Sequence, residues 1–330
     1  MPFCRFGIDL GSTSTVVCRL GQGLVLQEPS LMVVRTGDHR PEPVLVGFEA
    51  QQLQGRLRNG LTVVRPFRDG AVTDLLAARA YLTSVLRRIT PRPWDRMRPQ
   101  AMLSAPAGST ALERRALLEV AEEAGFGRVT LIPGPIAGAV GCNLDPMEPR
   151  VHLAVDAGGG RFEAMAFCYG EVLASRSSRI AGEEMTFALR RHLRQQHRLV
   201  VADLTAESVG MSVREPNGPL VLEGRDLESG KPRLITMSAE EVGEVLDPVG
   251  EEIAEALAEC LEELPPLAVM DVLQEGVLLF GGGALVPGLA EVMARAFGAP
   301  VRVAEQPLTC VAEGAAICAR RSDLRQAYAL

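Results

Sequence analysis

Apolar positions follow two different periods along this chain, and each period predicts one kind of element. Short apolar runs bounded by Gly, Asp and Pro predict strands, and apolar residues three or four positions apart predict helices. The expected strands cover 6–10, 16–20, 24–27, 101–104, 128–132, 152–156, 162–167 and 172–176. The expected helices cover 74–88, 109–125, a segment starting at 135, 182–197, 239–264, 286–297 and 309–320. Strands and helices mixed in this order predict an α/β protein.

The second half of the chain repeats the plan of the first half. Each half also contains a polar stretch rich in turn residues, at 36–60 and at 214–238. We therefore expect two α/β halves, each with a smaller inserted subdomain. A length of 330 residues fits two domains of ordinary size.

Three glycine-rich turns give the strongest chemical signal in the sequence. The first begins at Asp9 and the second at Asp156, each at the end of an expected strand, and the third, 281–283, follows the apolar run 276–280. Glycine allows tight turns whose backbone N–H groups surround an anion, and an aspartate can hold Mg²⁺ through its waters. Each turn alone is typical of an ordinary hairpin, but three in this order and spacing favour a nucleotide site.

Composition narrows the function classes. The chain has 41 acidic and 34 basic residues and a net charge of −7, so its overall balance argues against a nucleic-acid partner. No segment approaches the roughly 20 apolar residues of a membrane span, and the first expected strand starts too early to leave room for a signal peptide. Seven scattered cysteines without a CxxC pair predict reduced, mainly buried thiols in a cytosolic protein.

The histidines and cysteines show no ligand spacing that would indicate a structural metal site. His152 lies in an apolar strand and is expected to be packed there. His192 and His197 lie on a helix rich in arginine, a pattern typical of a solvated face. We therefore expect no structural metal in this chain.

Several longer segments resemble the MreB family within the actin, Hsp70 and sugar-kinase superfamily. They are 64–74, 106–115, 179–185, 281–289 and 305–312, and with the glycine turns they extend over nearly the whole chain. The last two, GGGALVPGL and EQPLTCVA, are fairly specific to MreB within the superfamily. The resemblance implies an actin-like α/β fold, in which two RNase H-like α/β domains surround a nucleotide cleft and each contains a smaller inserted subdomain.

The same resemblance implies domain limits and a function. Domain I would comprise 1–148 and 306–330, with subdomain IB at about 34–62, and domain II would comprise 149–305, with subdomain IIB at about 183–240. ATP and magnesium are expected in the cleft. The protein is expected to form filaments in the bacterial cytoplasm, peripherally on the cytoplasmic membrane, that organise cell shape and wall synthesis.

The resemblance also assigns roles to single residues. Asp9 and Asp156 fall on the catalytic side of the cleft, where they would hold Mg²⁺ through water. Glu207 falls where the family contacts the ribose, and the third glycine turn falls beside the adenosine. The expected nucleotide-binding residues are Gly11, Ser12, Thr13, Gly158, Gly159, Gly160, Arg161, Glu207, Gly281, Gly282 and Gly283.

Three departures from the family pattern gather in this site. Gly134 takes the place of the glutamate that positions the attacking water, and glycine has no side chain to orient or deprotonate water. Arg161 takes the place of a threonine that helps hold the γ-phosphate; an arginine could contact a phosphate bidentately or obstruct the site. Gly210 and Ser212 replace a lysine and a glutamate on the adenosine side. We therefore expect nucleotide binding with weak or absent ATP hydrolysis and looser base recognition.

The loop 87–98 contains the only tryptophan of the chain, Trp94, among five arginines. Tryptophan suits the membrane interface, and cations are attracted to anionic lipids. With the resemblance, Trp94 and Met97 are expected to form a peripheral membrane anchor. The alternative is that Trp94 packs on its own subdomain and the arginines form a solvated rim.

Three functional hypotheses stay open at this point. The preferred one is a nucleotide-dependent filament protein of the MreB type, whose partners would be copies of itself, another MreB, the inner membrane surface and membrane-bound wall-synthesis proteins. The second is a degenerate, non-hydrolysing actin-like scaffold or modulator of a true MreB. The third, a small-molecule kinase or a chaperone ATPase on the same fold, has no supporting signature in the sequence.

Overall fold

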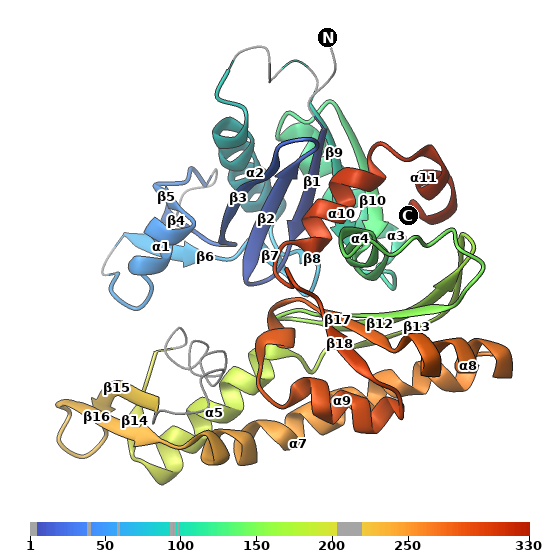
Figure 1. The fold of residues 1–330 in the computed structure, drawn as a ribbon. Coiled ribbons are helices and arrows are strands. Elements are labelled where there is room, and N and C mark those ends of the chain that lie inside the picture. Colours follow the sequence, from blue (N-terminus) through green and yellow to red (C-terminus); the bar gives the residue numbers. More distant parts are fainter. Residues whose placement is uncertain are drawn as a thin grey trace.

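Two five-stranded sheets, one in each half of the chain, organise the molecule (Figure 1). The computed structural model describes residues 5–37, 41–57, 60–92, 95, 97, 99–202 and 220–330. The strand order of the first sheet is β10 (Arg128–Pro133), β9 (Gln100–Ala105), β1 (Arg5–Leu10), β2 (Ser14–Arg19) and β3 (Gly23–Pro29). The order of the second is β13 (Glu171–Ser178), β12 (Phe162–Cys168), β11 (His152–Ala157), β17 (Val277–Phe280) and β18 (Val301–Val303).

The two sheets share one topology, which is the structural counterpart of the repeat in the sequence. β1 and β11 are the central strands, and each pairs antiparallel with the next strand and parallel with a strand from later in the chain. In each of the meanders β1-β2-β3 and β11-β12-β13, the pairing of the second strand with the third contains one register irregularity. The carboxyl ends of β1 and β11 therefore occupy equivalent positions, and both Asp-Gly turns begin there.

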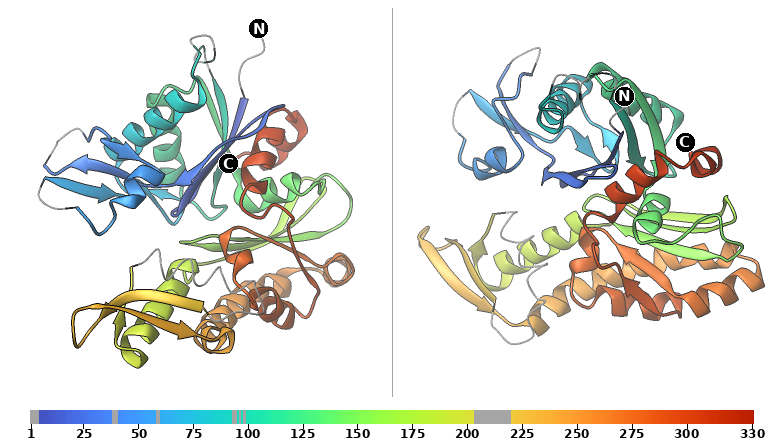
Figure 2. Two further views of the ribbon diagram at one scale, coloured as in Figure 1. Left: turned by 60° about the vertical axis from the view of Figure 1, so that its left-hand side comes forward. Right: turned by 45° about the horizontal axis from the view of Figure 1, so that its top comes forward.

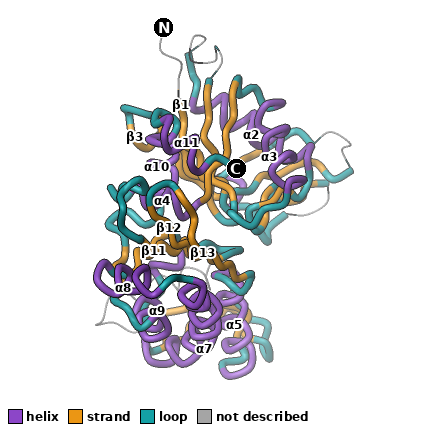
Figure 3. Tube along the Cα trace, turned by 90° about the vertical axis from the view of Figure 1, so that its right-hand side faces the viewer, coloured by secondary structure: helices purple, strands orange, loops and turns teal. Residues whose placement is uncertain are grey.

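Helices cover the outer faces of both sheets (Figure 3). Phe6 and Ile8 of β1 point into a core shared with the helices of the first half, and Leu153 and Val155 of β11 point into that of the second half. This spacing is the period of two that a strand imposes on its side chains. The covering helices are α2 (Leu75–Ile89) and α3 (Ala111–Glu123) on the first sheet, and α5 (Gly182–Gln196), α7 (Ala239–Ala258), α8 (Pro266–Glu275) and α9 (Leu289–Phe297) on the second.

Two helices rich in small residues, α4 (Gly134–Gly141) and α10 (Cys310–Cys318), lie between the sheets (Figure 1). They cross at glycines: a Cβ on Gly314 would lie 2.6 Å from the backbone nitrogen of Gly141. A Cβ on Gly7 of β1 would overlap the backbone of α10, and Phe280 of β17 fills the space beside Gly138 of α4. Backbone contacts this close leave little freedom, because protein interiors are densely packed and transmit strain.

Two smaller sheets project on the same side of the molecule, one from each half, as Figure 2 shows. The first small sheet consists of β5 (Leu45–Val46), β4 (Met32–Arg35) and β6 (Leu61–Val64), with α1 (Phe48–Gln52) beside it, and the second of β14 (Leu199–Val200), β15 (Leu220–Asp226) and β16 (Pro232–Met237). The polar stretches 36–60 and 214–238 overlap these sheets only in part, because β4, β6 and β14 lie outside those stretches. The finer domain limits proposed from the sequence stay predictions.

Some elements differ from the sequence-based expectation. The helix expected to start at 286 starts at Leu289, because Gly288 adopts a left-handed φ of 80° and separates α9 from the 3₁₀ turn η3 (Gly282–Leu285). The long helix continues through Pro248 and changes at Ala258 into the 3₁₀ helix η2 (Glu259–Glu263). Elements not predicted are α8, β18, α11 (Ser322–Tyr328) and the hairpin β7 (Phe67–Arg68) and β8 (Ala71–Val72). Among the described residues, no helix combines the length and apolar character needed to cross a membrane.

Replacing Gly314 with Ala should destabilise the protein, since the new Cβ would overlap backbone atoms of α4. Overpacking of this kind typically costs about 1–3 kcal/mol. Gly243→Ala in α7 is the matched control, because no described atom outside its own stretch of helix lies within 4 Å of its Cβ position. The control should gain about 0.5–1 kcal/mol from better helix propensity. Urea unfolding of both variants measures the difference, and two effects of the same sign would contradict the tight crossing.

Candidate functional site

The first two glycine turns have the same hydrogen-bond geometry. The Gly11 N–H donates to the Ser14 carbonyl at 2.9 Å, and the Gly158 N–H donates to the Arg161 carbonyl at 2.9 Å. A Cβ on Gly11 would lie 2.9 Å from that Ser14 oxygen, and one on Gly158 would lie 2.8 Å from the Arg161 oxygen. Both turns therefore need glycine at the same place, and they are equivalent parts of the two halves.

The two turns face each other at close range. A Cβ on Gly160 would lie 2.5 Å from Ser12 Oγ, and one on Gly159 would overlap Thr13 Oγ1. Ser12 Oγ also accepts the backbone N–H of Asp69 at 2.8 Å, which ties the first turn to the β7–β8 hairpin. A side chain at the second or third glycine of the second turn would therefore displace the Thr13 or Ser12 side chain of the first turn. Sequence analysis predicted both turns, but not this mutual contact.

The turns line one small cavity of about 100 Å³. It joins the carboxyl ends of β1, β9 and β11 to the start of α4. A larger hollow of about 690 Å³ lies near Arg19 and Arg88. Neither Asp9, Asp156 nor the two glycine turns line this hollow, so the smaller cavity is the candidate site. Its lining residues are Asp9, Leu10, Gly11, Ser12, Gly70, Ser104, Ala105, Pro106, Gly134, Asp156, Gly158, Gly159, Gly160, Arg161 and Glu163.

Two aspartates give the cavity a concentrated negative charge. Burial away from water raises the pKa of Asp9. A 2.6 Å hydrogen bond from the Ser104 hydroxyl lowers this pKa, but by less than burial raises it. Loss of water contact also raises the pKa of Asp156 well above its usual value, and the charges of Asp9 and Glu163 raise it further. Carboxylates that repel each other in a poorly solvated site suit a cation such as Mg²⁺, which prefers oxygen ligands.

Arg161 places a guanidinium at the same cavity. Its Nε is buried and, within the described part of the chain, has no hydrogen-bond partner. The charge of Arg161 lowers the pKa of both Glu113 and Glu163, although other groups have larger effects on each. A buried guanidinium nitrogen without a partner is costly, so an anionic ligand would complete this site.

The sequence analysis missed Glu163, which lies two residues beyond Arg161 on β12. Its side chain is 5% exposed and accepts the Ala107 N–H at 2.9 Å. Burial is the largest influence on the pKa of Glu163 and raises it to about 7. The hydrogen bonds from the Ala107 and Gly108 N–H groups and the charge of Arg161 lower this pKa by smaller amounts. An apolar strand interrupted by a single glutamate was the available sequence signal.

Thr13 and the glycines of the third turn, also predicted as site residues, are not among the residues that line this cavity. Gly281 packs on the end of β11, where a Cβ would lie 2.5 Å from the Ala157 carbonyl oxygen, and a Cβ on Gly283 would lie 2.5 Å from the Phe162 ring. The Cβ position of Gly282 faces open space among the described residues. Glu207 and Trp94 lie outside the described residues, as do Gly210 and Ser212.

The second turn is also joined to the helix that follows it. The N–H of Glu183, in the first turn of α5, donates to the Gly159 carbonyl at 2.7 Å. The Glu183 carboxylate pairs with Arg68 of β7 at 3.3 Å, which is a contact between the two halves of the molecule. Because both side chains are exposed, this ion pair contributes little to stability.

Two α/β halves of one topology, with paired glycine turns between them, define an actin-like fold. The solved structure of MreB 5 of Spiroplasma citri bound to AMPPNP matches with a TM-score of 0.87 at 28% identity, over 97% of each chain. A MamK double helical filament matches with a TM-score of 0.79 at 22% identity, over 97% of this chain and 99% of that chain. This second match is a likeness of fold alone.

Sequence comparison identifies the family. The family model described as MreB/Mbl protein matches residues 3–327. The cell shape-determining protein MreB of Escherichia coli strain K12 is 34% identical over an alignment of 319 residues that covers 93% of this chain and 90% of the relative. This chain therefore belongs to the MreB/Mbl family, and the family and fold expected from the sequence are confirmed.

Glu163 should make the nucleotide-free protein less stable as the pH rises. Its pKa of about 7 in the folded state exceeds the ordinary 4.5, so the folded state holds the proton more tightly. The stability from this group is present below about pH 4.5 and is lost as the pH rises through 7. A shift of this size corresponds to about 3 kcal/mol. Glu163→Gln stays neutral and should lack this loss.

The measurement is urea unfolding at pH 4.5 and pH 8 in the absence of nucleotide and magnesium. Asp9 and Asp156 remain in the variant, so the informative quantity is the difference between wild type and Glu163→Gln at each pH. Glu119→Gln, an exposed position on α3, is the control and should follow wild type. The prediction would be wrong if the stability of wild type relative to Glu163→Gln were the same at pH 4.5 as at pH 8.

Proposed function

We propose that this chain binds ATP and magnesium between its two glycine turns, hydrolyses ATP weakly or not at all, and polymerises into membrane-associated filaments. These filaments would lie on the cytoplasmic membrane and organise cell shape and wall synthesis. The main support is the pair of equivalent glycine turns that face each other across the aspartate-lined cavity. The AMPPNP bound to MreB 5 of Spiroplasma citri supports a nucleotide, and the MamK filament supports assembly of this fold.

The phosphates would be held by backbone N–H groups of both turns, with hydroxyls from Ser12 and Thr13. The cavity of about 100 Å³ is smaller than the roughly 300–1,000 Å³ of typical ligand pockets. A nucleotide would therefore separate the two turns, which now touch through Ser12 and Gly160. Because one turn from each half would bind the phosphates, a bound nucleotide would hold the two halves of the molecule together.

Asp9 and Asp156 would hold Mg²⁺ through water, and the ion would neutralise phosphate charge. The raised pKa of each aspartate supports this assignment, because a cation would stabilise both poorly solvated carboxylates and relieve the repulsion of Asp156 by Asp9. Arg161 would add a second positive charge with its unpartnered Nε. Arg161 would thus favour phosphate binding over obstruction, since guanidinium binds phosphate oxygens in charge-assisted hydrogen bonds.

Gly134 explains why hydrolysis would be weak. It begins α4 at the cavity wall, and its Cβ position lies 2.6 Å from Asp156 Oδ2. The Asp156 carboxylate thus occupies the space into which a side chain at 134 would extend. Among the other lining residues, Glu163 has a carboxyl group, but it is held by the Ala107 N–H. No observation favours the scaffold or modulator hypothesis over a nucleotide-dependent filament.

The protein with ATP and magnesium should form pelletable filaments while releasing phosphate slowly or not at all. Gly134→Glu should speed the release, since general acid–base assistance is typically worth ~10²–10⁴-fold. Gly134→Ala displaces Asp156 in the same way without supplying a carboxylate, and should stay slow. Brisk release by the wild type would refute the hydrolysis proposal. Absence of both filaments and bound radiolabelled ATP would refute the whole proposal and favour the scaffold.

Membrane contact is proposed at the loop that follows α2. Met97 is 68% exposed, so its apolar side chain is accessible for insertion into a membrane. Arg87 lies in the last turn of α2 beside this loop, next to Arg88, which pairs with Glu28, and a cation near an anionic leaflet contributes about 1 kcal/mol. Trp94 and Met97 together would form the anchor. The proposed partners are copies of this chain, another MreB and membrane-bound wall-synthesis proteins.

Replacing both Trp94 and Met97 with Ala should reduce co-sedimentation with anionic liposomes, because the apolar anchor is lost while the arginines remain. Leu112→Ala, which removes another exposed apolar side chain from α3 (77% exposed), is the control and should bind as wild type does. Both variants are compared at matched filament content, so that altered assembly is not mistaken for altered binding. Equal co-sedimentation of the double variant and wild type would end the anchor proposal.

A further inference from the structure

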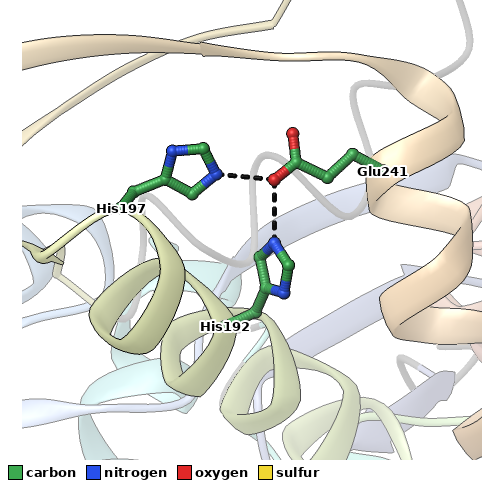
Figure 4. A group of neighbouring side chains, drawn as sticks. All are labelled: His192, His197 and Glu241. Atoms are coloured by element: carbon green, nitrogen blue, oxygen red, sulfur yellow. Dashed lines mark hydrogen bonds and ion pairs between the residues drawn. The ribbon is translucent and has the colours of Figure 1, made fainter.

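Two of the four histidines of the chain meet one carboxylate far from the glycine turns (Figure 4). His192 Nε2 lies 2.8 Å and His197 Nε2 lies 2.5 Å from the same oxygen, Oε1 of Glu241. The histidines come from the end of α5, and Glu241 comes from the first turn of α7. The sequence predicted a solvated face for both histidines; this is wrong, because about three-quarters of each side chain is buried.

Glu241 is diverted from the role that its sequence position predicts. Ser238 and Glu241 have the spacing of a capping box, in which the glutamate side chain returns to the N-cap N–H. At the start of α3 the same spacing gives the full box: the Glu113 carboxylate accepts the Thr110 N–H at 2.7 Å. At α7 only the Ser238 hydroxyl caps the helix, accepting the Glu241 N–H at 3.1 Å. The Glu241 carboxylate faces the histidines instead.

We propose that His192, His197 and Glu241 form a binding site for a divalent transition-metal ion of the zinc type. The donor atoms of the three residues all lie within 4.8 Å of one another, and among the described residues they are the one such group. Zinc binds imidazole nitrogen and carboxylate oxygen at about 2.0–2.2 Å. The two nitrogens would move from hydrogen-bond distance to about 3.4 Å from the oxygen, as tetrahedral ligands at that bond length require.

The donor set selects the metal. Two imidazoles and one carboxylate suit zinc and neighbouring transition metals, whereas Mg²⁺ prefers oxygen ligands alone. The site is therefore chemically distinct from the proposed magnesium site in the cavity. Three protein ligands leave one position of a tetrahedral ion for water.

The surrounding charges permit a cation here. The negative end of the α5 dipole lies at His197, the C-cap residue. Arg233 donates to the His197 carbonyl at 3.2 Å, and its charge is paired with Asp226 at 3.0 Å.

A bound ion would fix the end of α5 to the start of α7. The other end of α5 contacts the second glycine turn through the Glu183 N–H. The helix has 15 residues and so spans about 22 Å. The metal would thereby hold in place a helix that begins at the candidate nucleotide site and ends at the small sheet β14-β15-β16. This inference does not depend on nucleotide binding.

The test is a zinc titration of the full chain, without an affinity tag, against a chromogenic chelator. Wild type should bind one zinc ion per chain, and millimolar Mg²⁺ should not displace it. Glu241→Gln and His192→Gln should each weaken binding by about tenfold or more, since even loss of groups that only orient metal ligands costs 10–100-fold. Glu240→Gln, the exposed neighbour on the same helical turn, is the control and should bind as wild type does.

Two further readouts separate metal binding from a fold defect. Zinc should raise the melting temperature of wild type and Glu240→Gln, but not of Glu241→Gln, because only a ligand bound to the native state stabilises it. When cobalt replaces zinc, wild type and Glu240→Gln should show the visible absorption of a tetrahedral ion. Glu241→Gln and His192→Gln should not show it. Equal zinc affinity in Glu241→Gln and Glu240→Gln, or no bound zinc in wild type, would overturn the proposal and leave an ion-paired triad.

Discussion

The contact between α4 and α10 is the constraint on which the rest of the structure depends. Both helices lie between the two sheets, and they approach so closely that Gly141 and Gly314 have no space for a Cβ. Gly7 extends the same contact to β1, and Phe280 extends it to the second sheet. The central strands β1 and β11 are therefore held at a set distance, and their carboxyl ends meet. The glycine turns face each other because this helix pair places them there.

Repetition of one topology explains how two distant parts of the sequence form one site. Each half supplies an aspartate at the end of its central strand and a glycine turn closed by the same hydrogen bond. The symmetry is only partial, because Ser14 in the first turn corresponds to Arg161 in the second. That difference gives the cavity one guanidinium besides its three carboxyl groups, Asp9, Asp156 and Glu163, so both signs of charge line one small space.

The cavity and the histidine cluster show the same principle at two ends of α5. In both places, side chains that look ordinary in the sequence become unusual because a remote element removes water or supplies a partner. Glu163 is a lone acid in an apolar strand until the Ala107 loop and the second sheet bury it. Glu241 is half of a capping pattern until His192 and His197 reach it. From the local sequence pattern alone, Glu163 would be expected to face solvent and Glu241 to cap α7.

The amino-acid sequence alone determined the α/β class, the two-fold plan, the family and the positions of the two paired glycine turns. These follow from local periodicity and from glycine and aspartate at strand ends, which need only neighbouring residues to be recognised. It misplaced the start of α9 and missed α8, α11 and β18, which are short and depend on packing for their stability.

The tertiary structure decided which residues touch. It alone brought Ser12 to Gly160, Ser104 to Asp9, and Arg68 to Glu183, and it kept the third glycine turn out of the cavity. Such contacts join positions tens to more than a hundred residues apart, so no local period encodes them. They arise when the two sheets are fixed around α4 and α10, because only then do distance and burial act on these side chains.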